Sequence, residues 1–163
     1  MGGVILRQIQ ELPDRGGIMW CGCCLLAPPN KGSRLASTLC QNEYAKYIFG
    51  TLFGESALEL GDLLQAGSWP EPPQPCGIIA GNKSLALSNP TSWLTFALRT
   101  FEGASDGTVS VTETQLPVSC VADSVEVSVA HTFMMYDEKV QRLVVNFIRQ
   151  GSFSCSLGDG CEG

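Results

Sequence analysis

The chain has 163 residues, 44% of them hydrophobic and 16% charged, with a formal net charge of −6. That length suits one domain with a real core, and the composition is too apolar for a mostly disordered chain. Its ten basic residues are scattered along the sequence, so we expect no phosphate-backbone footprint and no nucleic-acid partner.

The N-terminal part predicts one helix and one strand. Val4–Leu12 places its apolar residues close to a helical stripe and Pro13 follows, so we expect a helix that starts almost at residue 1. Ile18–Ala27 is an unbroken apolar run, typical of a central strand covered on both faces in a mostly parallel sheet. This run is shorter than the roughly 20 residues of a membrane span, and no secretory signal precedes it. We therefore expect no transmembrane segment and, by default, an intracellular protein.

The middle of the chain predicts two helices, a strand and a long connection. The helices are expected over residues 33–49 and 53–66. CGIIAG, residues 76–81, is typical of a short buried strand. The connection over residues 82–107 is rich in Ser, Asn and Gly, and connections of this length often carry function.

The last part repeats the pattern of strand, turn and helix. VEVSVA, residues 125–130, is β-branched and predicts a strand. Residues 137–150 predict an amphipathic helix whose apolar side carries Val140, Leu143, Val144, Phe147 and Ile148. Residues 154–163 are expected to form a disordered tail. The alternation predicts an α/β fold with its sites at the carboxyl ends of the strands.

His131 is the only histidine, and it stands just past the strand predicted over residues 125–130, where side chains point into the site crevice. An isolated histidine is more often a hydrogen-bonded core or surface residue than a catalytic one. Asp106 is a candidate partner, because a carboxylate after the long connection could orient the imidazole and stabilise its charged form. The alternative is an ordinary turn aspartate in an Asp-Gly pair.

No nucleophile is recognisable in the sequence. GESAL, residues 54–58, comes nearest to the G-x-S-x-G elbow, but Leu58 stands where glycine is required. Ser56 is therefore interpreted as a helix residue. A cysteine nucleophile at Cys23 or Cys24 is a further alternative, although thiols inside a strand should be buried and inert.

The eight cysteines are better explained as small buried hydrophobes than as metal ligands. Only one short-spaced group occurs, Cys21, Cys23 and Cys24, with no second pair elsewhere, and the lone histidine lies over a hundred residues from this group. We expect no metal and no other cofactor.

Four blocks of the sequence resemble successive blocks of the small lipase-like α/β-hydrolases, in the same order and with similar spacing. They are LLAPPNKGSRLA (residues 25–36), GIIAGNKS (77–84), SDGTVSVTETQLP (105–117) and VSVAHTFMMYDEKVQRLVVNFIRQGSF (127–153). The resemblance implies a three-layer α/β-hydrolase-like domain over residues 1–153. Of that fold, the chain would hold the C-terminal part, with about three strands of a mostly parallel sheet and flanking helices. By the same match, Asp106 is the acid and His131 the base of a Ser-His-Asp triad.

The resemblance also implies that the nucleophile is missing from the chain as written. Family members carry G/T-H-S-M-G-G-V-I-L-R at the elbow, and this chain begins M-G-G-V-I-L-R. Met1 then falls one residue after the serine, at the position whose backbone N–H helps form the oxyanion hole. The implied function is a truncated hydrolase of ester or lipid-like substrates. It would be inactive as written, because a triad without its nucleophile cannot carry out covalent acyl transfer.

A different interpretation is a non-catalytic remnant or protein-interaction module. The missing serine favours it, and so do the unusual CGCC strand and PVSCVAD at residues 117–123, where relatives tend to have glycine and methionine. Loss of the central strands would expose an apolar sheet edge, which could pair with another chain or with a second copy.

Overall fold

The computed structural model describes residues 2–13, 19–32, 69–84 and 103–154. Several expectations fall outside this part of the chain, namely the helices over 33–49 and 53–66, Ser56, Met1 and residues 155–163 of the tail. They stay predictions.

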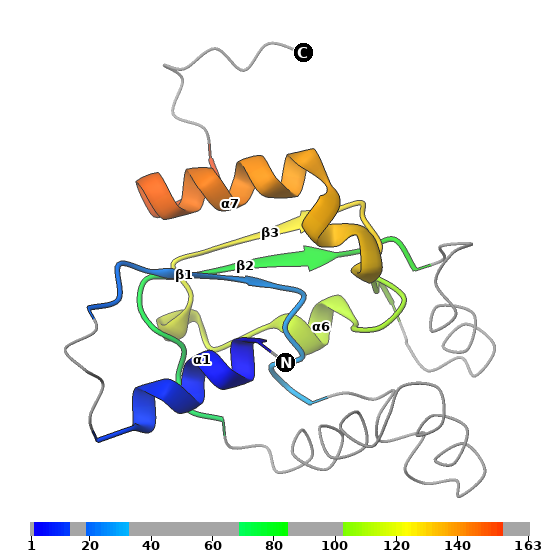
Figure 1. The fold of residues 1–163 in the computed structure, drawn as a ribbon. Helices are drawn as coiled ribbons and strands as arrows, with labels where there is room; N and C mark the ends of the chain where they lie inside the picture. Colours follow the sequence, from blue (N-terminus) through cyan, green and yellow to red (C-terminus); the bar gives the residue numbers. More distant parts are fainter. Residues whose placement is uncertain (1, 14–18, 33–68, 85–102, 155–163) are drawn as a thin grey trace, which may run out of the picture.

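Three parallel strands form the centre of the structure (Figure 1). They are β1 (Cys23–Leu26), β2 (Cys76–Gly81) and β3 (Asp123–Val127), in the order β1-β2-β3. β2 lies between the other two and all its residues are buried, as a strand with two parallel neighbours and two covered faces requires. The strand predicted over residues 76–81 is confirmed.

Helices lie on both faces of this sheet (Figure 1). On one face are α1 (Gly2–Glu11) and α6 (Val111–Thr114), and on the other is α7 (Glu138–Gln150). The 3-10 helix η1 (Val118–Cys120) precedes β3, and η2 (His131–Tyr136) leads from β3 to α7. A parallel sheet with flanking helices confirms the α/β class. Within the described ranges, none of the helices has the length and apolar character needed to cross a membrane.

β1 differs from its prediction in length and in position. The sequence predicts a central strand over residues 18–27, whereas β1 has four residues and lies at the edge of the described sheet. Gly22 has φ +145°, close against the Pro75 carbonyl, and Ala27 has φ 41°. These left-handed conformations end the extended backbone on either side of β1. An apolar pattern does not encode them, which is why the prediction is too long.

β3 and α7 follow the prediction with small shifts. β3 ends at Val127 because the N–H of Val129 donates to the Val127 carbonyl at 2.9 Å and turns the chain. α7 begins after Asp137, whose side chain caps the first turn, and ends at Gly151 in the left-handed conformation. The predicted helix is therefore confirmed at both ends.

The predicted apolar side of α7 covers the core, except at its C-terminal end. Val140 and Phe147 are buried, and Leu143 and Val144 pack against the same cluster. Ile148 is 56% exposed, so its predicted burial is wrong. The rings of Phe147 and Phe153 pack against each other with centroids 4.9 Å apart and planes tilted by 31°, on the face of β2 that α7 covers, which ties the end of the helix to the sheet.

α1 begins at Gly2, as predicted, but its buried residue is a cation. Arg7 is 4% exposed, whereas Ile5 and Leu12 of the predicted apolar stripe are each 53% exposed. Burial lowers the pKa of the Arg7 guanidinium, because desolvation disfavours the charged form. A buried guanidinium needs an acceptor, and Asn30, in the turn after β1, provides one.

Candidate acid-base site

Asp106 lies at the end of the connection after β2 and is completely buried. Its Oδ1 accepts the backbone N–H groups of Thr108 at 2.9 Å and Val109 at 2.7 Å, and its own N–H donates to the Val109 carbonyl at 3.0 Å. This is the local turn expected of an Asp-Gly pair. Because Oδ1 is held by the turn, Oδ2 is fixed in direction and left for another donor.

The first turn of α6 anchors the C-terminal end of the turn that begins at Asp106. Ser110 caps the helix and Glu113 reaches back, in a reciprocal capping box. The Glu113 carboxylate accepts the Ser110 N–H at 2.7 Å and the Ser110 hydroxyl at 2.9 Å. Both residues are buried, so the capping box anchors the segment that follows Asp106.

His131 begins η2, beyond the end of β3, and meets Asp106 at two points. Its ring Nδ1 lies 2.6 Å from Asp106 Oδ2, and its backbone N–H donates to the Asp106 carbonyl at 3.0 Å. The His131 side chain is 37% exposed, while that of Asp106 is 1% exposed. The two candidates from the sequence therefore form one unit, with the carboxylate inside and the imidazole at the surface.

A carboxylate at Nδ1 selects one tautomer of the imidazole. The proton sits on Nδ1, where the acidic partner accepts it, and Nε2 keeps its lone pair. Nε2 has no hydrogen-bond partner in the described part of the chain. An imidazole in this state can take a proton from a hydroxyl placed at Nε2 and later return it.

A second polar network links α1 to α6 and was missed in the sequence. The Arg7 guanidinium donates to Asn30 Oδ1, and Asn30 Nδ2 donates to the Thr114 carbonyl at 2.5 Å. The backbone N–H of Lys31 adds a bond to the Glu113 carbonyl at 3.0 Å. The PPNKG turn after the first strand is visible in the sequence. Nothing in the sequence indicates, however, that an arginine on α1 would hydrogen-bond to this turn.

The described cysteines form no disulfide, and most of them are buried. Cys21 is exposed, whereas Cys23, Cys76 and Cys120 are buried. A hydrogen bond from the Cys76 thiol lowers the pKa of Cys23, and the same bond raises the pKa of Cys76. Desolvation raises the pKa of Cys24 to about 12, so this thiol is a poor nucleophile at neutral pH. In the described ranges no group of three His, Cys, Asp or Glu side chains could hold a metal ion.

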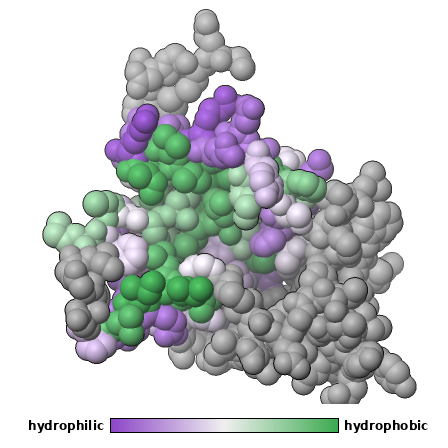
Figure 2. All heavy atoms as spheres, in the orientation of Figure 1, coloured by the Kyte–Doolittle hydropathy of each residue, from purple (hydrophilic) through white to green (hydrophobic). Residues whose placement is uncertain are grey.

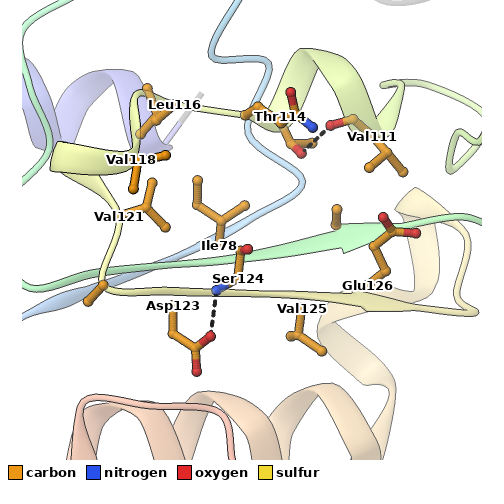
Figure 3. Close-up of a pocket in the computed structure, with 13 residues that line it drawn as sticks. Ile78, Val111, Thr114, Leu116, Val118, Val121, Asp123, Ser124, Val125 and Glu126 are labelled. Carbon is orange, nitrogen blue, oxygen red and sulfur yellow. Dashed lines mark hydrogen bonds between the residues drawn. The ribbon is translucent and has the colours of Figure 1, made fainter.

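A cavity of about 900 Å³ lies between the sheet and the segment from α6 to η1 (Figure 3). Its walls combine apolar and polar side chains, with Ile78 and Ser124 pointing in from the strands and Val121 facing them. Neither Asp106 nor His131 lines it. The cavity is therefore separate from the acid-base pair.

No known protein-family model, curated protein or solved structure matches this chain. The function of the chain is therefore inferred from the geometry of the site and from the resemblance of the four sequence blocks.

Proposed function

We propose that the chain supplies the acid and the base of a serine hydrolase that cleaves carboxylic esters, within a longer polypeptide. The observation that carries the proposal is the Asp106–His131 pair, with 2.6 Å between Oδ2 and Nδ1 and a half-exposed ring. A Ser-His-Asp triad needs, besides its serine, a buried acid, an oriented imidazole and an Nε2 that can accept a proton, and among the described residues Nε2 has no partner. By the family resemblance, the serine would precede Met1.

In the proposed reaction, His131 Nε2 takes the proton of the serine hydroxyl while the serine oxygen attacks the ester carbonyl. The resulting imidazolium then gives this proton to the departing alcohol, which leaves an acyl-serine. Water repeats the two transfers, releasing the carboxylic acid and restoring the serine. Asp106 holds the ring and stabilises its positive charge, and by the resemblance the backbone N–H of Met1 would bind the oxyanion.

The order of the elements supports a further strand before α1. α6 lies in the crossover from β2 to β3, on the face of the sheet that also carries α1 (Figure 1). Crossovers between parallel strands are right-handed. Two crossovers that step across the sheet in the same direction therefore place their helices on the same face. α1 fits such a crossover, leading from a strand on the open side of β1 into β1. The proposed fold is the three-layer α/β-hydrolase, with β1 as an inner strand of a wider sheet.

One observation favours the second candidate function, a protein-interaction module. β1 is the edge of the described sheet, and Figure 2 shows apolar residues gathered on that side between α7 and α1. Ile5 of α1 and Ile148 of α7 are among the exposed apolar side chains. Such a surface can be covered either by a further strand of the same polypeptide or by another molecule.

The test compares two polypeptides, the 163-residue chain and a version extended by the in-frame codons before Met1. We expect the extended protein to hydrolyse p-nitrophenyl butyrate and the shorter chain to be inactive. His131→Ala should abolish the activity, because no other group in the pair can move the proton. Val145→Ala, on the exposed side of α7, is the matched control and should keep it.

Three results would contradict the proposal. A stop codon directly before Met1, or a folded extended protein without esterase activity, would favour the interaction module. Activity of the 163-residue chain that is lost in His131→Ala would mean that the nucleophile lies inside this chain.

A further inference from the structure

Gly81, the last residue of β2, occupies the point at which three segments converge. A Cβ at this position would lie 2.6 Å from the Val129 carbonyl oxygen, 2.7 Å from Asp106 Cβ and 2.8 Å from Met134 Cε. Real Cβ atoms essentially never approach other heavy atoms this closely. Gly81 is not among the glycines with positive φ. The structure therefore needs glycine here for space and not for a special backbone conformation.

The three neighbours of Gly81 are Asp106 and two residues of the segment that carries His131. Asp106 is the acid itself, and Val129 and Met134 stand on either side of His131 in the sequence. Two of the three contacts are to atoms that cannot swing away, a backbone oxygen and a Cβ. Only Met134, a flexible side chain, could retreat by rotating. An added methyl group would therefore push the Asp106 loop and the segment before His131 apart.

The hydrogen bond between the two residues is sensitive to such a displacement. Oδ2 and Nδ1 are 2.6 Å apart, and the backbone bond between the same residues is 3.0 Å long. Hydrogen bonds of this kind weaken steeply with distance and misalignment. We propose that Gly81 is a positioning residue for the proposed reaction: its missing side chain lets the carboxylate of Asp106 approach the ring of His131. The inference rests on the proposed function for its catalytic meaning, but the pairing can be measured without activity.

Gly77 offers a matched control on the same strand. A Cβ at Gly77 would lie 2.8 Å from the rings of Phe147 and Phe153, which pack in the core under the other end of β2. Gly77→Ala thus imposes a comparable clash without any contact to the acid-base pair. If Gly81 had a purely structural role, Gly81→Ala and Gly77→Ala should have the same effects on the protein.

The chain contains one histidine, so nuclear magnetic resonance reports on His131 without overlap. With the ring neutral, we expect wild-type protein to show a downfield ring N–H signal and the ¹⁵N shifts of a ring protonated at Nδ1. The spectrum of Asp106→Asn serves as the reference for a His131 ring that has lost its carboxylate partner. Gly81→Ala should lose the N–H signal and move both ¹⁵N shifts towards a tautomer mixture. Gly77→Ala should lower the melting temperature and keep the wild-type ring spectrum.

The outcomes separate the two proposals. A wild-type ring spectrum in Gly81→Ala would overturn the positioning role and leave the proposed function standing. A wild-type protein without the Nδ1–H signature, or one unchanged by Asp106→Asn, would remove the basis of both. If Gly81→Ala does not fold, Gly81→Ala combined with Met134→Ala replaces it. This double variant removes the flexible contact, keeps the two rigid ones and should still lose the signature.

Discussion

Asp106 binds His131 through its side chain and its main chain together. Oδ2 lies 2.6 Å from the ring Nδ1, and the carbonyl accepts the His131 N–H at 3.0 Å. The main-chain hydrogen bond fixes the position of His131, at which η2 starts, and the side-chain hydrogen bond fixes the orientation of the His131 ring. The acid thus sets both the position and the tautomer of the base.

Asp106→Asn should separate these two functions. The amide can keep the turn and the backbone bond but no longer accepts the ring proton as a carboxylate does, so the other tautomer is favoured. In the extended polypeptide we expect kcat to fall by about 10⁴-fold, the order seen when a triad acid becomes an amide. Steady-state kinetics with p-nitrophenyl butyrate measures it. Glu126→Gln, which removes an exposed carboxylate from β3, should leave kcat unchanged, and an equal loss there would point to a general charge effect.

Asn30→Ala should destabilise the fold through Arg7. The buried guanidinium would lose its side-chain acceptor, and the Thr114 carbonyl would lose a donor. An unsatisfied buried polar group costs about 1–3 kcal/mol, more when it is charged. Urea unfolding of the single variants and of Asn30→Ala with Arg7→Met gives the coupling energy. Additive losses would show that the two side chains do not depend on each other.

The sequence predicts those elements whose signals are local. β2 is predicted with its correct bounds, because a buried parallel strand is an unbroken apolar run, and α7 is predicted because Asp137 and Gly151 mark its ends. β1 is predicted too long, since the conformations of Gly22 and Ala27 depend on contacts with other segments.

For the site, the sequence indicates that Asp106 and His131 pair, but it does not indicate the packing contacts that hold them in position. The places of Asp106 and His131 after strands, together with the family resemblance, predict that these two residues pair. The burial of Arg7, its bond to Asn30 and the space at Gly81 come from packing between segments far apart in the chain. No periodicity or short motif records such contacts, so they could not be predicted.

The stability of the fold should fall at alkaline pH because of Cys24. Its pKa is raised from about 9 to about 12 by burial, so between these values the unfolded chain loses a proton that the folded chain keeps. The stabilisation is complete below pH 9 and is lost as the pH rises towards 12. Urea unfolding on both sides of pH 9 should show a smaller decrease for Cys24→Ala than for the wild type. Equal decreases would mean that this thiol contributes nothing.

The 163-residue chain should self-associate through β1. The N–H of Cys23, in β1, donates to the Pro75 carbonyl just before β2 at 2.9 Å, and the N–H of Ala27, just after β1, donates to the Ile79 carbonyl of β2 at 2.8 Å. N–H groups alternate in direction along a strand, so those of Cys24 and Leu26 point away from β2, towards the open edge of the described sheet. An edge of this kind, flanked by exposed apolar side chains, is a template for pairing with another strand. Light scattering coupled to gel filtration should show a mass that rises with protein concentration.

A proline at the open edge tests this association without breaking the ladder to β2. Cys24→Pro removes an outward N–H and should yield a monomer, because proline at an edge blocks strand addition. Cys24→Ala keeps that N–H and is the matched control, so it should still associate. Association that persists in Cys24→Pro would assign it to another surface, such as the exposed residues of α7. A wild-type chain that stays monomeric at all concentrations would instead mean that the β1 edge does not pair.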